Sequence, residues 1–294
     1  MMVFFREDFT YDCVPFGRFM DIHSWYDGEH IPFNNAFDDV VFTQMIFTGT
    51  SNTSSTTTYA KARWVGPLMG VSPGGQVVTF RICDFYFVPD KIEYNFMMFD
   101  VIDIFRQAGM PVLPPAPLPE EGYVAPPANM DGVPAPLSAF VVSDTTAATQ
   151  ALALQALTDD WELQLPEGSG VWRDTMIWYG QAGFGVARGI EAYRGGLLAP
   201  MHAAMSDPHV DAKIVSCEGD ICGIFGTVSF KQANTFLGQD PDASSSDLIL
   251  ELRFGFHYRA EGGKLVEGYA MFDLPGLFDQ WSISLYDRAI EQQS

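Results

Sequence analysis

The fold is decided by residues 77–100, VVTFRICDFYFVPDKIEYNFMMFD, and by residues 248–273, LILELRFGFHYRAEGGKLVEGYAMFD. Each stretch alternates in polarity on both sides of a short turn, residues 88–90 in the first and residues 261–263 in the second. Period-two alternation around turn residues predicts two antiparallel strands joined as a hairpin. A shift of 173 positions relates matching residues: Phe85, Lys91, Phe99 and Asp100 recur as Tyr258, Lys264, Phe272 and Asp273. The sequence therefore predicts the same hairpin twice.

The duplication extends to the N-terminal side of both hairpins. A shift of 168 positions relates a second set of residues: Tyr11, Phe16, Gly17, Ile22, Pro32, Ala36 and Asp39 recur as Tyr179, Phe184, Gly185, Ile190, Pro200, Ala204 and Asp207. The change from 168 to 173 predicts extra residues in the second copy, most simply in the loop at 238–244. A helix is predicted before the strands of each copy, over residues 19–34 and 186–203. A helix followed by antiparallel strands is an α+β unit.

A proline-rich segment separates the two copies. Residues 111–136 hold nine of the chain's 19 prolines, which excludes the interiors of helices and central strands. We therefore predict two domains, residues 1–110 and 137–294, joined by a stiff linker over residues 111–136. A further helical stretch at residues 144–157 has no counterpart in the first copy. Either the first copy is truncated at its start, or this helix serves both copies.

The composition limits the partners and the location that we expect. With 16 basic and 37 acidic residues the formal charge is −21, which repels nucleic acid and anionic membrane surfaces. The apolar start is too short for a signal peptide, and no run of about 18 apolar residues occurs, so we expect a soluble cytoplasmic protein. The cysteines are too few and irregular for a disulfide framework or a zinc site, so we expect reduced thiols, no metal and no cofactor. They are Cys13, Cys83, Cys217 and Cys222.

Three segments carry a resemblance to a known family. They are residues 178–185 (WYGQAGFG), residues 32–39 (PFNNAFDD) and residues 81–86 (RICDFY). In this order they resemble the opening motif, the Pro-Phe-x-x-Ala-Phe-Pro-Asp segment and the Arg-x-x-Asp-aromatic-aromatic strand of the SnoaL-like polyketide cyclase family, which is part of the NTF2-like superfamily. The resemblance implies two tandem cone-shaped α+β barrels, each a curved antiparallel sheet with helices packed on its concave face.

Asp84 is the one charged residue on an otherwise apolar strand face. Its neighbours on that face are Val78, Phe80, Ile82 and Tyr86. Burial there would raise the pKa of Asp84 toward the range in which a carboxylate is an effective general base. The matching strand of the second copy has an apolar face of Leu250, Leu252, Phe254, Phe256 and Tyr258. We expect this second face to pack against another sheet, in an intrachain pseudo-dimer or a homodimer.

The resemblance implies proton transfer next to a carbonyl group, with hydrogen-bond donors that stabilise the enolate. Asp84 matches the family's acid/base residue, and His30, close to Pro32, is a candidate second catalytic group. Asn95 and Tyr86 are candidate hydrogen-bond donors. His257 stands 173 positions after Asp84, so it and Trp178 are the candidate binding residues of the second copy. Two such sites would differ in their chemistry.

Two functions remain open. The first is a cofactor-free cyclase, isomerase or dehydratase that uses acid/base chemistry on a small apolar carbonyl compound. The second is a non-catalytic protein that binds a small molecule or supports assembly, because the fold alone does not define the function. The two are distinguished by whether Asp84 faces a pocket of ligand size with a hydrogen-bond donor opposite it.

Overall fold

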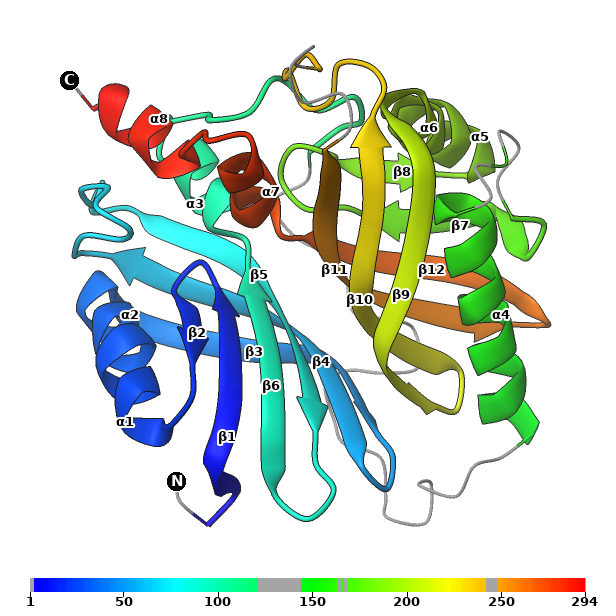
Figure 1. Ribbon diagram of the computed structural model, residues 1–294, viewed down its shortest axis with the longest axis horizontal. Coiled ribbons are helices and arrows are strands. Elements are labelled where there is room, and N and C mark those ends of the chain that lie inside the picture. The colour runs from blue at the N-terminus through cyan, green and yellow to red at the C-terminus, as the bar shows by residue number, and fades with distance from the viewer. Residues whose placement is uncertain (1–2, 121–143, 163–164, 166–168, 242–247, 294) are drawn as a thin grey trace.

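The computed structural model describes residues 3–120, 144–162, 165, 169–241 and 248–293, and within them it contains two six-stranded sheets (Figure 1). The strands of the first sheet are β1 (Phe5–Val14), β2 (Gly17–Phe19), β3 (Phe37–Gly49), β4 (Thr53–Trp64), β5 (Val77–Phe87) and β6 (Ile92–Phe99). Those of the second sheet are β7 (Trp172–Tyr179), β8 (Val186–Arg188), β9 (Met205–Glu218), β10 (Ile221–Gln232), β11 (Ile249–Glu261) and β12 (Lys264–Phe272).

Both sheets have the same strand order, β2-β1-β6-β5-β4-β3 in the first and β8-β7-β12-β11-β10-β9 in the second. Neighbouring strands are antiparallel except for one parallel pair in each sheet, β1 with β6 and β7 with β12. The sheets are therefore mixed rather than wholly antiparallel. The repeated order confirms the predicted duplication and the α+β class. We call the two halves the first unit and the second unit.

A continuous helical segment follows the second strand of each unit. It consists of α1 (Ile22–Trp25), the π-helix η1 (Tyr26–His30) and α2 (Ile31–Ala36) in the first unit, and of α5 (Ile190–Tyr193), the π-helix η3 (Arg194–Leu198) and α6 (Ala199–Ala204) in the second. The predicted helices begin too early, because residues 17–19 and 186–188 pair with β1 and β7 as strands. In the first unit the helix begins at Asp21, whose carboxylate accepts hydrogen bonds from two backbone N–H groups.

The helix α4 (Asp144–Trp161) closes the second unit. It packs on β9, β10, β11 and β12, and the ring of Trp161 lies 5.5 Å from that of Phe256. Near its N-terminus Thr146 accepts a hydrogen bond from the Gly219 N–H, and Thr149 donates one to the Gly219 carbonyl. In the first unit the described residues before β1 form only a turn. Of the two alternatives for this helix, the structure places it on the second unit.

The remaining helices follow the last strand of each sheet. They are α3 (Val101–Gln107) after β6, and α7 (Leu274–Gln280) and α8 (Leu285–Glu291) after β12. Residues 111–120 of the predicted linker are described, and there Leu118 is buried and the Pro119 carbonyl accepts a hydrogen bond from Val186 N–H. This part of the linker is thus packed against the second unit. Residues 121–136 of the predicted linker lie outside the described residues.

The two sheets meet through the faces that carry no helices (Figure 1). We call the helix-covered face of each sheet its inner face and the opposite face its outer face. Between the outer faces, the rings of Phe96 and Phe225 stack with centroids 3.8 Å apart, and Arg253 pairs with Asp12 at 2.8 Å. In Figure 1, α1 and α2 lie at one side of the molecule and α4 at the other, with the sheets between them.

The prediction that the apolar face of β11 packs against another sheet is wrong. The apolar row from Leu250 to Tyr258 is buried, but it lies on the inner face, beneath α4 and against Trp161 and Trp172. The row that contains Arg253 and His257 faces the first unit instead. The physical reason is that a helix covers the apolar face, while the polar side chains of the other face find partners across the contact between the units.

Strand pairing shows which residue of the second unit corresponds to Asp84. Asp84 pairs with Thr56 on β4, and Thr56 corresponds to Ile224 by the 168-residue shift. Ile224 pairs with Phe256. The counterpart of Asp84 is therefore Phe256, and the expected equivalence with His257 is wrong by one residue.

A β-bulge explains this error. Arg259 and Ala260 are neighbours on β11, but their partners on β12, Glu267 and Leu265, are two residues apart, so the bulge inserts one extra residue into β12. The shift of 173 positions therefore holds for β12, whereas β11 is shifted by 172 positions. An error of one residue exchanges the two faces of a strand. Of the five extra residues in the second unit, this bulge accounts for one. The other four fall between β10 and β11, and the predicted loop at 238–244 lies partly outside the described residues.

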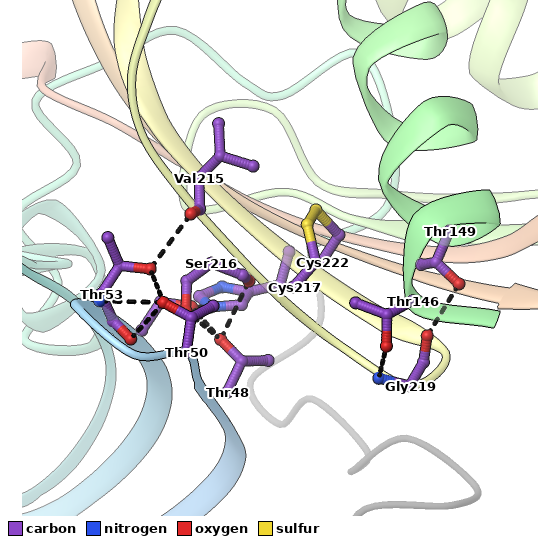
Figure 2. Close-up of a disulfide and its surroundings, with 12 residues drawn as sticks. Thr48, Thr50, Thr53, Thr146, Thr149, Val215, Ser216, Cys217, Gly219 and Cys222 are labelled. Atoms are coloured by element: carbon purple, nitrogen blue, oxygen red, sulfur yellow. Dashed lines mark hydrogen bonds between the residues drawn. A yellow bond between two sulfur atoms is a disulfide. The ribbon is translucent and has the colours of Figure 1, made fainter. Parts of the chain in front are cut away.

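The prediction of four reduced cysteines is wrong for one pair. Cys217 and Cys222 form a disulfide that links β9 to β10 near their shared turn (Figure 2). The two residues pair directly across the hairpin, so their side chains share one face, a relation that irregular spacing in the sequence does not reveal. Cys13 and Cys83 are free and buried.

Candidate functional site

The inner face of the first sheet carries two adjoining cavities of ≈ 540 and ≈ 470 Å³. They share four lining residues, Tyr11, Trp25, Gln44 and Asp84, so they form one groove. We call this feature the first-unit groove. It runs between the helical segment and the strands, over the space that α4 fills in the second unit. Its volume is in the range of small-molecule sites.

Asp84 lies where the two cavities meet. Its side chain is half-buried on β5, and Asn95 on β6 donates a hydrogen bond to it through Nδ2 at 3.4 Å. Burial raises the pKa of Asp84 to about 7, although the Asn95 amide and the Tyr86 hydroxyl, as hydrogen-bond partners, lower it in part. A carboxyl group with this pKa can both accept and return a proton near neutral pH.

Glu29 is a second carboxyl group in the groove, and the sequence analysis did not select it. It lies on η1 with 6% of its surface exposed, and it lines the same cavity as Asp84. Burial raises its pKa to about 7, the Trp25 indole N–H lowers it in part, and the charge of Asp84 raises it further. Trp25 Nε1 makes no well-formed hydrogen bond with any group, so the indole does not fully compensate the carboxyl group of Glu29.

A signal for Glu29 was present in the sequence. The spacing of Ile22, Trp25, Glu29 and Phe33 places these residues on one face of a helix, just as period two placed Asp84 on one face of a strand. A carboxylate on an apolar helical face is a candidate functional group for the same reason as a carboxylate on an apolar strand face. The π-turn at residues 26–30 then determines how deeply it is buried.

His30 also lines the groove, beside Glu29 on the helical segment. Its ring lies 5.4 Å from that of Trp25 and 5.1 Å from that of Tyr26. The structure thus brings four of the predicted site residues to the first-unit groove. They are Asp84, His30, Asn95 and Tyr86.

The two predicted site residues of the second unit lie elsewhere. His257 is buried at the contact between the units, with Nδ1 3.0 Å from Thr57 Oγ1 and Nε2 3.0 Å from Ser55 Oγ. Burial lowers its pKa to about 3, with the charge of Arg81 as a second cause. Trp178 is buried in the core of the second unit with its ring 6.0 Å from that of Tyr193. Neither residue reaches the groove.

In the second unit the corresponding space is packed. Phe256 stands in place of Asp84, and Leu197 stands in place of Glu29; both are buried. The helix α4 is held there by Asp160, whose Oδ2 accepts hydrogen bonds from Trp172 Nε1 at 2.8 Å and Tyr193 hydroxyl at 3.0 Å. In the second unit, where α4 covers the sheet, the residues at the positions of Asp84 and Glu29 are thus apolar.

In the part of the chain that the structure describes, no group of three or more His, Cys, Asp and Glu side chains is placed to hold a metal ion. None of the described helices is long and apolar enough to cross a membrane.

Comparison with solved structures finds proteins that resemble one unit. They include TsrD from Streptomyces laurentii, with 21% identity, a TM-score of 0.40, and coverage of 47% of this chain and 96% of that one. A SnoaL-like polyketide cyclase from Agrobacterium tumefaciens has 16% identity and a TM-score of 0.36, with 45% and 97% covered. A protein with a ketosteroid isomerase-like fold from Catenulispora acidiphila, in complex with trimethylamine, has 14% identity and a TM-score of 0.37, with 45% and 94% covered.

These similarities are distant and carry no argument about a reaction or a ligand. No protein-family model matches the sequence, and no curated protein is matched by it. The strand order, the helical segment on each inner face and the repetition of both define the chain as two tandem α+β units of the same fold.

Proposed function

We propose that the first-unit groove binds a small, largely apolar carbonyl compound and that Asp84 moves a proton next to its carbonyl group. Aldol cyclisation, isomerisation and dehydration all begin with this step. The observation that carries the proposal is the position of Asp84, a half-buried carboxyl group in an apolar groove with Asn95 beside it. Its counterpart in the packed second unit, Phe256, cannot transfer a proton.

The surroundings of Asp84 suit such a step. Asp84 would take a proton from the carbon next to the carbonyl, and the electron pair of that C–H bond would form the enolate. Asn95 Nδ2 and the Tyr86 hydroxyl are the nearest donors for the enolate oxygen. Returning the proton to another carbon completes an isomerisation without a cofactor. His30, on the far side of the groove, is a candidate for a second proton-transfer group.

The test uses 3-cyclohexenone, a small ketone whose isomerisation to the conjugated 2-cyclohexenone is followed by ultraviolet absorbance. Asp84→Asn should lower the rate by about 10²–10⁴-fold, the usual contribution of a general base, with the fold intact by circular dichroism. Asp27→Asn, which removes an exposed carboxylate from the same helical segment as Glu29, should leave the rate unchanged. Equal rates for the wild type and Asp84→Asn would contradict the proposal.

The alternative is a non-catalytic binding protein. It is favoured if the wild type binds the ketone, by nuclear magnetic resonance titration, without accelerating its isomerisation over buffer. In that case Asp84 and Asn95 would serve as hydrogen-bond partners of the ligand.

A further inference from the structure

Glu29 is a buried acid that the proposed proton transfer does not use. Only 6% of its surface is exposed, and it lines the same cavity as Trp25. Among the described residues, no ion pair involves this carboxyl group, and the Trp25 indole N–H lies close enough to lower its pKa without making a well-formed hydrogen bond. A buried carboxylate without a counter-ion is costly, so a cation that enters the groove would stabilise the ionised form of Glu29.

The groove supplies no positive charge of its own to Glu29. Neither Lys nor Arg lines the cavity that holds Glu29, whereas Lys91 lines the other cavity of the groove, as does its neighbour Asp90. The titratable groups that face Glu29 come from every surrounding element. They are Tyr11 and Cys13 on β1, His30 on the helical segment, and Asp84 on β5.

Aromatic rings surround the same position. The rings of Tyr11 and Trp25 lie 5.6 Å apart, and Phe33 and Phe42 line the same cavity. The faces of such rings attract cations, most strongly where water is excluded. Two carboxyl groups and several ring faces, without a lysine or arginine, therefore form a surface that favours a positively charged group with an apolar body.

We propose that the ligand of the first-unit groove carries an organic ammonium group, with Glu29 as its counter-ion in the cavity that the Trp25 ring also lines. This inference rests on the proposed function, because it takes the groove to be the ligand site. The two carboxyl groups then have separate roles: Glu29 holds the charged end, and Asp84 faces the reacting carbon. A metal ion fits the site poorly, because a hard cation takes six or more oxygen ligands and the cavity that holds Glu29 offers two carboxyl groups.

The second unit supports this assignment by contrast. Its residues at the two acidic positions, Leu197 and Phe256, are apolar, and its groove is filled by α4. The acids are present only in the unit whose inner face is open. A structural role for Glu29 would not require an open groove.

The experiment compares benzyltrimethylammonium, a permanent cation, with its uncharged isostere neopentylbenzene, by nuclear magnetic resonance titration of the full chain. At pH 8 the cation should bind at least about tenfold more tightly than the isostere. Its affinity should fall by about tenfold or more between pH 8 and pH 5.5, because Glu29 and Asp84 take up protons over that range. The affinity of the isostere should change by less than about twofold.

Two variants isolate Glu29. Glu29→Gln should lower the affinity for the cation by about tenfold at pH 8 and leave the affinity for the isostere unchanged. Asp27→Asn should alter neither affinity. Equal binding of cation and isostere at pH 8, with no effect of Glu29→Gln, would overturn the ammonium assignment and leave the groove as a site for neutral ligands. Failure of both probes to shift any signal of the groove would overturn the groove as a ligand site, and with it the proposed function.

Discussion

Replacing Glu29 by Gln should stabilise the protein at pH 8 and have almost no effect at pH 4. The side chain keeps its shape but loses a charge that the fold must bury. Burial raises the pKa of Glu29 from an ordinary value of 4.5 to about 7. Above pH 4.5 the unfolded chain ionises freely, while the folded chain holds its proton until about pH 7, so stability falls over this range and then levels off.

The expected gain follows from the pKa difference. At about 1.4 kcal/mol for each pH unit, the interval from 4.5 to about 7 corresponds to about 3 kcal/mol. Urea unfolding of Glu29→Gln and of the wild type at pH 4 and pH 8 measures this difference as a change in the free energy of unfolding. Asp27→Asn, the exposed control, should stay within about 0.5 kcal/mol of the wild type at both pH values. Equal stability of Glu29→Gln and the wild type at pH 8 would refute the view of Glu29 as a buried, uncompensated acid.

Two further predictions concern the second unit. Phe256→Ala should cost about 3–5 kcal/mol in urea unfolding, because it leaves a cavity beneath Trp161, and a cost below about 1 kcal/mol would mean that α4 is not packed there. His257 has a pKa lowered to about 3 by burial, so it stays neutral in the folded chain while the unfolded chain gains a proton below about pH 6.5. Stability should therefore fall between pH 6.5 and pH 3, and His257→Gln should flatten this fall in a series of thermal melts; an unchanged slope would show that His257 is accessible to water.

The sequence was sufficient to predict the α+β class, the duplication and the hairpins of both units to within a few residues. These features depend on local periodicity and on repeated residues, which are visible in the chain itself. The position of Asp84 on one strand face with apolar neighbours followed from the same period of two, whereas the side of the sheet that this face occupies did not. The catalytic role assigned to Asp84 stays a prediction.

The predictions that were wrong concern features that depend on contacts between residues distant in the sequence. The bulge opposite Arg259 and Ala260 adds one residue to β12, so the shift between the two units differs by one between β11 and β12, and only the strand pairing reveals it. Whether an apolar strand face meets a helix or another sheet depends on where α4 docks, which the sequence does not specify. The disulfide between Cys217 and Cys222 depends on the register of β9 against β10. The burial of Glu29 depends on the π-helix at residues 26–30, which the 3.6-residue period of an α-helix does not predict.

The differences between the two units are linked by one physical constraint. If α4 or a similar helix covered the first unit, Glu29 and Asp84 would lie beneath it without a cation, and burying two unpaired carboxylates costs several kcal/mol each. If the second unit carried acids at Leu197 and Phe256, the packing of Trp161 against its sheet would be lost for the same reason. An apolar inner face with a covering helix and an acidic inner face with an open groove are thus two self-consistent solutions of one fold. The chain holds one of each, and only the open one leaves a proton donor or acceptor within reach of a ligand.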